Sequence, residues 1–354
     1  MSQTEAKAIA QVREYYGRII ESRRDLKTSV CCSTDALPVH QRKPAAMIAD
    51  EILNKFYGCG SPIPTAIEGA TVLDLGCGTG RDAYLASYLV GAEGRVIGID
   101  MTDEQLEVAR RHVDGQMARF GFLRTNVDFR FGYIEDLAGA GIEDSSIDVV
   151  ISNCVINLSP DKRRVFSEIL RVLKPGGELY FSDVFAGSRV PESIRNDPVL
   201  YGECLGGAMY IEDFRRLLGE LHVPDYRVVS RSRINLDEPE LEKKAGMVDF
   251  YSTTVRAFKL GNLEDICEDY GQVATYKGTI PESPHVFELD NHHKLIAGKP
   301  MLVCGNTAAM LQDTRFGQHV EVSGDRSTHY GPFDCAPAHQ RIDSDDDGIG
   351  GACC

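Results

Sequence analysis

A glycine-rich segment with an acidic residue inside it is the first feature of the chain that could do chemistry. Residues 72–80 read VLDLGCGTG and follow an apolar run. Gly76, Gly78 and Gly80 allow a tight turn and a close approach of the backbone to a ligand, at the end of a strand where open α/β sheets bind small molecules. Asp74 would repel a pyrophosphate and attract an ammonium group. The segment therefore predicts a site for a positively charged small molecule rather than for a dinucleotide.

Further polar residues follow the next predicted strands. Asp100 and Met101 end the second strand, where a carboxylate can accept both hydroxyls of a ribose. Ile134 and Glu135 follow the third strand and offer an apolar face and a carboxylate to an adenine. Together with the glycine segment, these residues resemble the class I S-adenosylmethionine methyltransferases. The resemblance implies that S-adenosylmethionine is bound by Asp74, Gly76, Gly78, Gly80, Asp100, Met101, Ile134, Glu135 and Asn153.

Four cysteines stand in segments that match a more specific group of enzymes. Cys154 lies in SNCVINL, after the fourth predicted strand, where residues of this fold face the transferable methyl group. Cys204 lies in GECLGGA, Cys59 in FYGCG, and Cys31 ends TSVC. From about residue 15 to residue 258 the chain resembles the arsenic(III) S-adenosylmethionine methyltransferases.

The chemistry of arsenic agrees with that resemblance. Trivalent arsenic is soft, binds thiolates and keeps a lone pair that can attack a sulfonium methyl group without a general base. The resemblance implies that Cys154 and Cys204 hold arsenic through the reaction and that Cys59 adds a third sulfur. It also implies that Cys31 pairs with Cys59 in a disulfide that returns methylated arsenic to the trivalent state, with thioredoxin or glutathione as reductant. The neighbouring Cys32 could replace Cys31, and the sequence alone does not choose between them.

The remaining cysteines and the histidines have plainer interpretations. Cys77, Cys267 and Cys304 are expected to be structural, because a buried thiol is a small hydrophobic group. No CxxC pair is present, so the spacing gives little support to a structural zinc site. Three cysteines near the C-terminal end either capture an arsenical or have no role: Cys335, Cys353 and Cys354. We expect a solvated turn at His292 and His293.

Short apolar runs that alternate with helical patterns predict the elements that position these residues. We expect two leading helices, over 5–25 and 44–56. The strands are expected at 71–75, 96–100, 127–131, 149–152, 179–183, 226–234 and 250–258, and the helices between them at 80–89, 103–120, 160–173 and 212–221. The pattern predicts an α/β fold, a Rossmann-like class I methyltransferase sheet with an inserted substrate region and a small C-terminal α+β module.

Four regions follow from this pattern. Residues 1–187 are expected to form the leading helices and the S-adenosylmethionine-binding domain, and residues 188–262 an arsenical-binding region that completes the sheet. Residues 263–340 are expected to form a small C-terminal domain with short strands. The glycine-rich and acidic residues 341–354 are expected to be a disordered, cysteine-containing tail.

Composition limits the partners. The 354 residues include 53 acidic and 38 basic side chains, a net charge of −15 that repels phosphate backbones and anionic lipids. We therefore expect neither nucleic acid nor a membrane as a partner. The start of the chain lacks the apolar core of a signal peptide, which predicts a cytoplasmic protein. We expect a monomer.

The resemblance thus implies the activity of an arsenite methyltransferase, which converts arsenite or methylarsenite to methylated arsenicals in arsenic detoxification. Two rivals remain open at this point. The same core often methylates a carbon or oxygen of a small organic molecule. A non-catalytic arsenical-binding protein would also use the cysteines, but it would not need the intact glycine segment.

Overall fold

A central sheet organises the computed structural model, which describes residues 9–10, 12–16, 37–58, 60–236 and 239–335. Its strand order is β3-β2-β1-β4-β5-β8-β7, and β6 pairs with β5. The strands are β1 (Thr71–Leu75), β2 (Arg95–Asp100), β3 (Val127–Phe131), β4 (Ile147–Asn153), β5 (Leu173–Ala186), β6 (Met209–Tyr210), β7 (Tyr226–Arg233) and β8 (Phe250–Phe258). Strands β1 to β5 run parallel to one another, whereas β8 is antiparallel to both β5 and β7. The predicted α/β, Rossmann-like sheet is confirmed.

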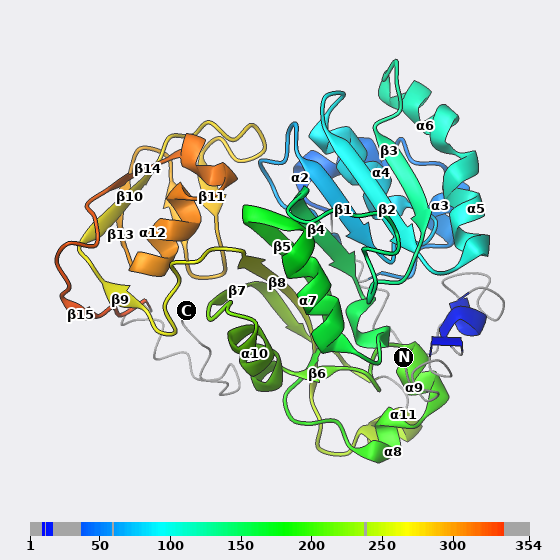
Figure 1. The fold of residues 1–354 in the computed structure, drawn as a ribbon. Helices are drawn as coiled ribbons and strands as arrows, with labels where there is room; N and C mark the ends of the chain where they lie inside the picture. The colour runs from blue at the N-terminus through cyan, green and yellow to red at the C-terminus, as the bar shows by residue number, and fades with distance from the viewer. Residues whose placement is uncertain (1–8, 11, 17–36, 59, 237–238, 336–354) are drawn as a thin grey trace.

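Helices cover both faces of this sheet (Figure 1). Those before β5 are α2 (Val39–Ala45), α3 (Asp50–Asn54), α4 (Arg81–Val90), α5 (Asp103–Arg111), α6 (Val113–Phe120) and α7 (Lys162–Val172), and those after it are α8 (Glu192–Arg195), α9 (Pro198–Gly202), α10 (Ile211–Glu220) and α11 (Pro239–Ala245). Alternate strand residues point to opposite faces. Thus Val72 packs with α3 to α6, whereas Leu73 and Leu75 pack with α7 and α10. The two apolar layers hold the carboxyl ends of β1, β2 and β4 at one edge.

Two predicted helices differ from the structure. The helix expected over 103–120 is divided at His112, whose ring lies 2.8 Å from Glu51 of α3. The helix expected over 44–56 is instead the two short helices α2 and α3. The break at His112 coincides with its contact with Glu51 of α3.

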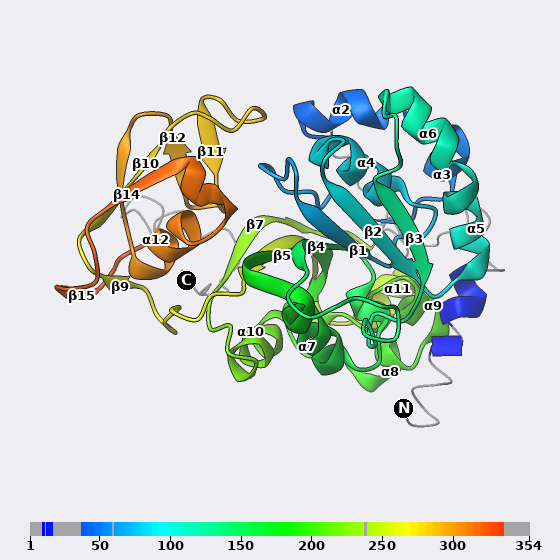
Figure 2. The same ribbon diagram turned by 45° about the horizontal axis from the view of Figure 1, so that its top comes forward.

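A small module follows β8, as Figure 2 shows. Its three-stranded sheet has the order β13-β10-β14, beside two antiparallel pairs, β11 with β12 and β9 with β15. The elements are β9 (Glu268–Asp269), β10 (Gln272–Tyr276), β11 (Val286–Glu288), β12 (Lys294–Ile296), β13 (Pro300–Val303), α12 (Gly305–Gln312), β14 (Val320–Ser323) and β15 (Gly331–Pro332). Helix α12 was not predicted, because nearly all its residues are buried and give no amphipathic period.

A buried ion-pair group joins the module to the sheet. Glu178 of β5 faces Arg256 of β8 at 2.8 Å and Arg315 of the module at 2.5 Å. Glu178 and Arg256 are almost fully buried, and Arg256 also donates to the Leu289 carbonyl at 2.6 Å. Removal of the carboxylate charge would leave two guanidinium groups without their shared counter-ion.

The first prediction concerns Glu178→Gln. We expect this variant to lose about 3 kcal/mol in the free energy of unfolding, because one member of a buried charge group is removed. Urea unfolding followed by circular dichroism measures the loss. Glu288→Gln is the matched control, since Glu288 forms an exposed pair with Lys294 at 3.0 Å and should change stability by less than about 1 kcal/mol. Equal losses in both variants would contradict the account.

The described part of the chain contains no helix that is both long enough and apolar enough to cross a membrane.

Candidate functional site

A cavity opens at the carboxyl ends of β1, β2 and β4. It spans about 990 Å³, including space open to solvent. Eight of the predicted cofactor residues line it: Asp74, Gly76, Gly78, Asp100, Met101, Ile134, Glu135 and Asn153. Gly80 does not line the cavity; it precedes α4, with a φ of 90°.

Two positions at this edge of the sheet have no room for a side chain and therefore require glycine. Gly76 has a φ of 68°, and a Cβ atom there would lie 2.4 Å from a methyl group of Val155. A Cβ atom on Gly80 would lie 2.7 Å from the ring of Phe129. A side chain at either position would therefore push the loop away from the strands that support it.

Asp74 has the environment expected of a partner for a cation. Its carboxylate is buried, and its Oδ2 atom accepts no hydrogen bond from the described residues. Burial raises the pKa of Asp74 well above its usual value, and the nearby charges of Asp82 and Asp100 raise it further. An ammonium or sulfonium group would relieve both effects, so the site fits S-adenosylmethionine, which carries both cations.

The other two acidic residues are already oriented. Asp100 accepts hydrogen bonds from the backbone N–H groups of Gly78 at 2.9 Å and Thr102 at 2.8 Å. Glu135 accepts one from the Ser159 hydroxyl at 2.5 Å. A carboxylate has more lone pairs than these bonds use. Both side chains can therefore also receive the hydroxyl or amino hydrogens of a nucleoside.

The N-terminal segment contributes to the cavity wall, a role that the sequence analysis did not assign. The helical residues Ile9, Val12 and Tyr16 line the cavity, together with Tyr57. The rings of Tyr16 and Tyr57 meet edge to face, with centroids 5.8 Å apart. The Tyr16 hydroxyl also donates to the Gly202 carbonyl at 2.8 Å. The same segment thus touches both the cavity and the loop before Cys204.

Cys154 and Cys204 come together although 50 residues separate them. Cys154 follows β4, lines the cavity and is buried, and Cys204 follows α9 and is fully buried. The Cys204 thiol donates to the Cys154 carbonyl at 3.1 Å. Both have a positive φ, 55° for Cys154 and 67° for Cys204. Such left-handed backbone is unfavourable for residues other than glycine and is concentrated at functional sites.

The other predicted catalytic cysteines, Cys31 and Cys59, and the alternative Cys32 lie outside the described residues. The residue before Cys59 is described. A Cβ atom on Gly58 would lie 2.5 Å from the Cγ atom of Asn153, so this segment runs directly against the end of β4. Cys154 is disulfide-bonded in this structure. It could hold a metalloid only after reduction.

Buried polar residues behind the two thiols fix the loop after β4. Asn157 donates to Asp183 at 2.7 Å and to the Val184 carbonyl at 2.6 Å. Lys162 donates to the Asn157 and Ser159 carbonyls at 3.3 and 3.0 Å. Burial raises the pKa of Asp183 to about 7 and lowers that of Lys162 to about 8. The sequence analysis did not single out these positioning residues, because they lie in different elements.

Gly207 is the contact between the Cys204 loop and this support. A Cβ atom on Gly207 would lie 2.0 Å from the Asn157 carbonyl oxygen, a distance that neither backbone could accept without moving. The glycine therefore lets the Cys204 loop approach the Cys154 loop closely.

The second prediction follows for Gly207→Ala. We expect at least a roughly tenfold lower affinity for trivalent arsenic, because displacement of one loop separates the thiols. S-adenosylmethionine affinity should change little. The matched control is Gly219→Ala in α10, where a Cβ atom meets open space. Titration of each variant with arsenite under reducing conditions gives its affinity for arsenic. Identical arsenic affinities for Gly207→Ala and Gly219→Ala would mean that the contact does not position Cys204.

One interpretation of the C-terminal module was wrong. His293 is not in a solvated turn: it is buried, and its Nδ1 atom lies 2.8 Å from Asp290. Cys267 and Cys304 are buried, as expected of structural cysteines, but their sulfur atoms and that of Cys335 also lie within 4.8 Å of one another. Sequence spacing could not show this, since 37 residues separate the first two.

Two family models match the chain. A methyltransferase domain matches residues 67–222, and the arsenite methyltransferase C-terminal domain matches residues 270–346. The first match covers the glycine segment, Cys154 and Cys204. The second covers most of the small module.

Named relatives match nearly the whole chain. Arsenite methyltransferase of Aquipseudomonas alcaligenes is 50% identical over 91% of this chain and 93% of its own length. The human arsenite methyltransferase is 42% identical over 87% of this chain and 81% of its own. The crystal structure of an arsenic(III) S-adenosylmethionine methyltransferase from Chlamydomonas reinhardtii matches at 51% identity with a TM-score of 0.82, covering 84% of this chain and all of that one. This chain therefore belongs to the arsenite methyltransferase family.

Proposed function

We propose that this protein transfers methyl groups from S-adenosylmethionine to trivalent arsenic held by the thiolates of Cys154 and Cys204. The observation that carries the proposal is the meeting of these two buried cysteines, with the Cys204 sulfur 3.1 Å from the Cys154 carbonyl, at a cavity lined by Asp74 and Asp100. A carbon or oxygen acceptor would need no pair of buried thiols. The family to which the chain belongs supports the same acceptor.

The residues bind and orient rather than move protons. S-adenosylmethionine, when bound, supplies an electrophilic methyl group. Asp74 faces its positive charge, and Asp100 and Glu135 receive its hydroxyl and amino hydrogens. Arsenite or methylarsenite exchanges oxygen ligands for the sulfurs of Cys154 and Cys204, with Cys59 as a third ligand in the first step. The thiolates leave the arsenic lone pair free to attack, so catalysis depends mainly on positioning.

A redox step is also part of the proposal. Methyl transfer raises arsenic formally from the trivalent to the pentavalent state. Oxidation of two thiols, Cys59 and either Cys31 or Cys32, to a disulfide provides the two electrons that restore trivalent arsenic. Thioredoxin or glutathione then reduces the disulfide. We further propose that the enzyme acts as a monomer in the cytoplasm, where such thiol reductants are abundant.

The function is tested with arsenite, S-adenosylmethionine and glutathione, followed by separation of the arsenic species by mass. Wild-type protein should form methylated arsenic, and Cys154→Ser should form little or none although it still binds S-adenosylmethionine. Methylated arsenic in equal amounts from both proteins would remove Cys154 from the mechanism. Tight arsenite binding without consumption of S-adenosylmethionine would show an arsenical-binding protein instead.

A further inference from the structure

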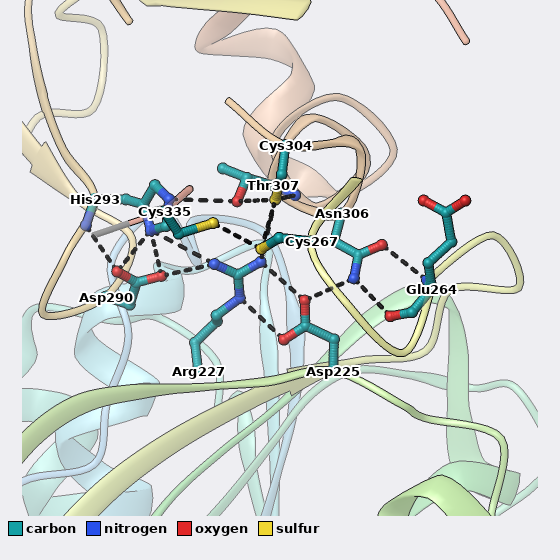
Figure 3. Close-up of polar contacts among 10 residues, drawn as sticks. All are labelled: Asp225, Arg227, Glu264, Cys267, Asp290, His293, Cys304, Asn306, Thr307 and Cys335. Carbon is teal, nitrogen blue, oxygen red and sulfur yellow. Dashed lines mark hydrogen bonds and ion pairs between the residues drawn. The ribbon is translucent and has the colours of Figure 1, made fainter. Parts of the chain in front are cut away.

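A second group of thiols lies in the C-terminal module, away from the cavity just described. The Cys267 sulfur lies 3.3 Å from that of Cys304 and 2.7 Å from that of Cys335. All three sulfur atoms lie within 4.8 Å of one another (Figure 3). A central atom bonded to sulfur at about 2.3 Å can join sulfurs up to roughly 4.6 Å apart. The Cys267–Cys304 and Cys267–Cys335 pairs lie inside that limit, and a small rotation of one side chain would let the three thiols share one ion.

The module builds this group from three separate segments. Cys267 precedes β9, Cys304 is the N-cap of α12, and Cys335 follows β15. Pairing of β9 with β15 brings Cys267 and Cys335 side by side, and the Phe333 N–H donates to the Cys267 carbonyl at 2.8 Å. Cys267 and Cys304 are buried, whereas Cys335 is half-buried. A ligand can therefore enter from the side of Cys335.

Charged residues around the thiols are already paired. Figure 3 shows the Arg227 guanidinium beneath the sulfurs, 4.0 Å from Cys304. Its ion-pair partners are Asp225 at 2.9 Å and Asp290 at 3.3 Å, and Asp290 also faces His293. A nearby guanidinium favours the thiolate form of a cysteine, which is the form that binds metals and metalloids.

The charge of the complex decides which ion fits. Structural zinc takes four ligands in a tetrahedron; the described residues supply three sulfurs, and reduction of the Cys267 disulfide would release its partner as a fourth thiol. Zinc with three thiolates would also add a net negative charge beside Asp225 and Asp290, which burial disfavours. Trivalent arsenic can take three thiolates in a pyramid, and the resulting complex is neutral.

We propose that Cys267, Cys304 and Cys335 form a second binding site, for a trivalent arsenical, distinct from the methylation site. Arsenous acid would exchange its three hydroxyl groups for three thiols and release three molecules of water, with no change of oxidation state. Cys267 is disulfide-bonded in this structure. The site therefore forms in the reduced protein, after a thiol or phosphine reductant supplies two electrons and two protons to that bond.

Arsenic stoichiometry tests the proposal directly. Full-length protein is reduced with a phosphine, incubated with excess arsenite and freed of unbound arsenite by gel filtration; arsenic and zinc per chain are then measured by mass spectrometry. Wild-type protein should hold about one arsenic more than Cys304→Ser. Serine can replace Cys304 as N-cap of α12, where its hydroxyl can accept from the Thr307 N–H. Cys335→Ser, at a half-buried position, is the second variant and should show the same loss.

Three results would overturn the site. One is an unchanged arsenic count in both variants. Another is the loss of one arsenic per chain in Cys353→Ser/Cys354→Ser. This control variant keeps the three-thiol group, so such a loss would place the arsenic on the tail. The third is stoichiometric zinc in wild-type protein that Cys304→Ser lacks. The choice of arsenite as probe rests on the proposed function, so methylation is assayed on the same samples. Methylation by both variants together with the lost arsenic separates this site from the catalytic one.

Discussion

Cys204→Ser is expected to lower kcat/KM for arsenite methylation by about 100-fold or more, because a hydroxyl is a poor ligand for a soft trivalent metalloid. The Cys204 thiol is buried against the Cys154 residue, where the two proposed ligands meet. S-adenosylmethionine affinity should stay within about threefold of wild type, because Cys204 does not line the cofactor cavity.

Steady-state kinetics and calorimetry give these two quantities separately. Cys335→Ser is the matched control, since it removes a thiol of the module and leaves the cavity intact; its kcat/KM should be close to that of wild type. Retention of wild-type methylation by Cys204→Ser would exclude Cys204 as an arsenic ligand. Loss of S-adenosylmethionine binding in the same variant would point to a disturbed fold and would contradict the role given to the residue.

Asp74→Asn is expected to weaken S-adenosylmethionine binding by about 10- to 100-fold, since a buried partner of a cation loses its charge. The effect of pH follows from the raised pKa of Asp74 in the unoccupied protein. Below that pKa the carboxyl is protonated, and a bound cation must expel the proton. Wild-type affinity should therefore rise with pH until Asp74 is ionised in the free protein, whereas the variant should lack this rise.

Calorimetry in buffers with different ionisation heats measures the protons released on binding. Wild-type protein should release protons at pH values where Asp74 is protonated, and Asp74→Asn should release fewer. Asp128→Asn is the control, because Asp128 forms a half-buried pair with Arg130 on β3, outside the residues that line the cavity. Equal proton release by wild type and Asp74→Asn would mean that a group other than Asp74 loses the proton when S-adenosylmethionine binds.

The sequence predicted best what local patterns determine. The bounds of β1, β3 and β8 agree with the apolar runs, because each strand is buried on at least one face along its length. Asp74 and Asp100 were found because they lie at the carboxyl ends of β1 and β2, which must meet at one edge of the sheet. The resemblance of the cysteine segments to a known family supplied the remaining predicted site residues, the cysteines.

Contacts between distant segments were not predictable from spacing. The thiols of Cys267, Cys304 and Cys335 meet only because the small sheets bring three loops together. Ile9 and Tyr16 line the cavity, but the sequence showed only that they belong to an amphipathic helix. Such a pattern predicts that the apolar face of the helix is covered, and it does not identify the covering surface. His293 stands among polar residues, yet Asp290 and Arg227 bury it in an ion-pair network.

Arsenic X-ray absorption tests the central claim most directly, that Cys154 and Cys204 hold one arsenic atom beside the cofactor cavity. Reduced Cys304→Ser protein, which lacks the proposed second site, is loaded with arsenite. The account predicts sulfur neighbours around arsenic, with fewer sulfurs and added oxygen when Cys204→Ser is combined with it. An unchanged sulfur shell after both Cys154→Ser and Cys204→Ser are introduced would contradict it, because arsenic would then be bound elsewhere.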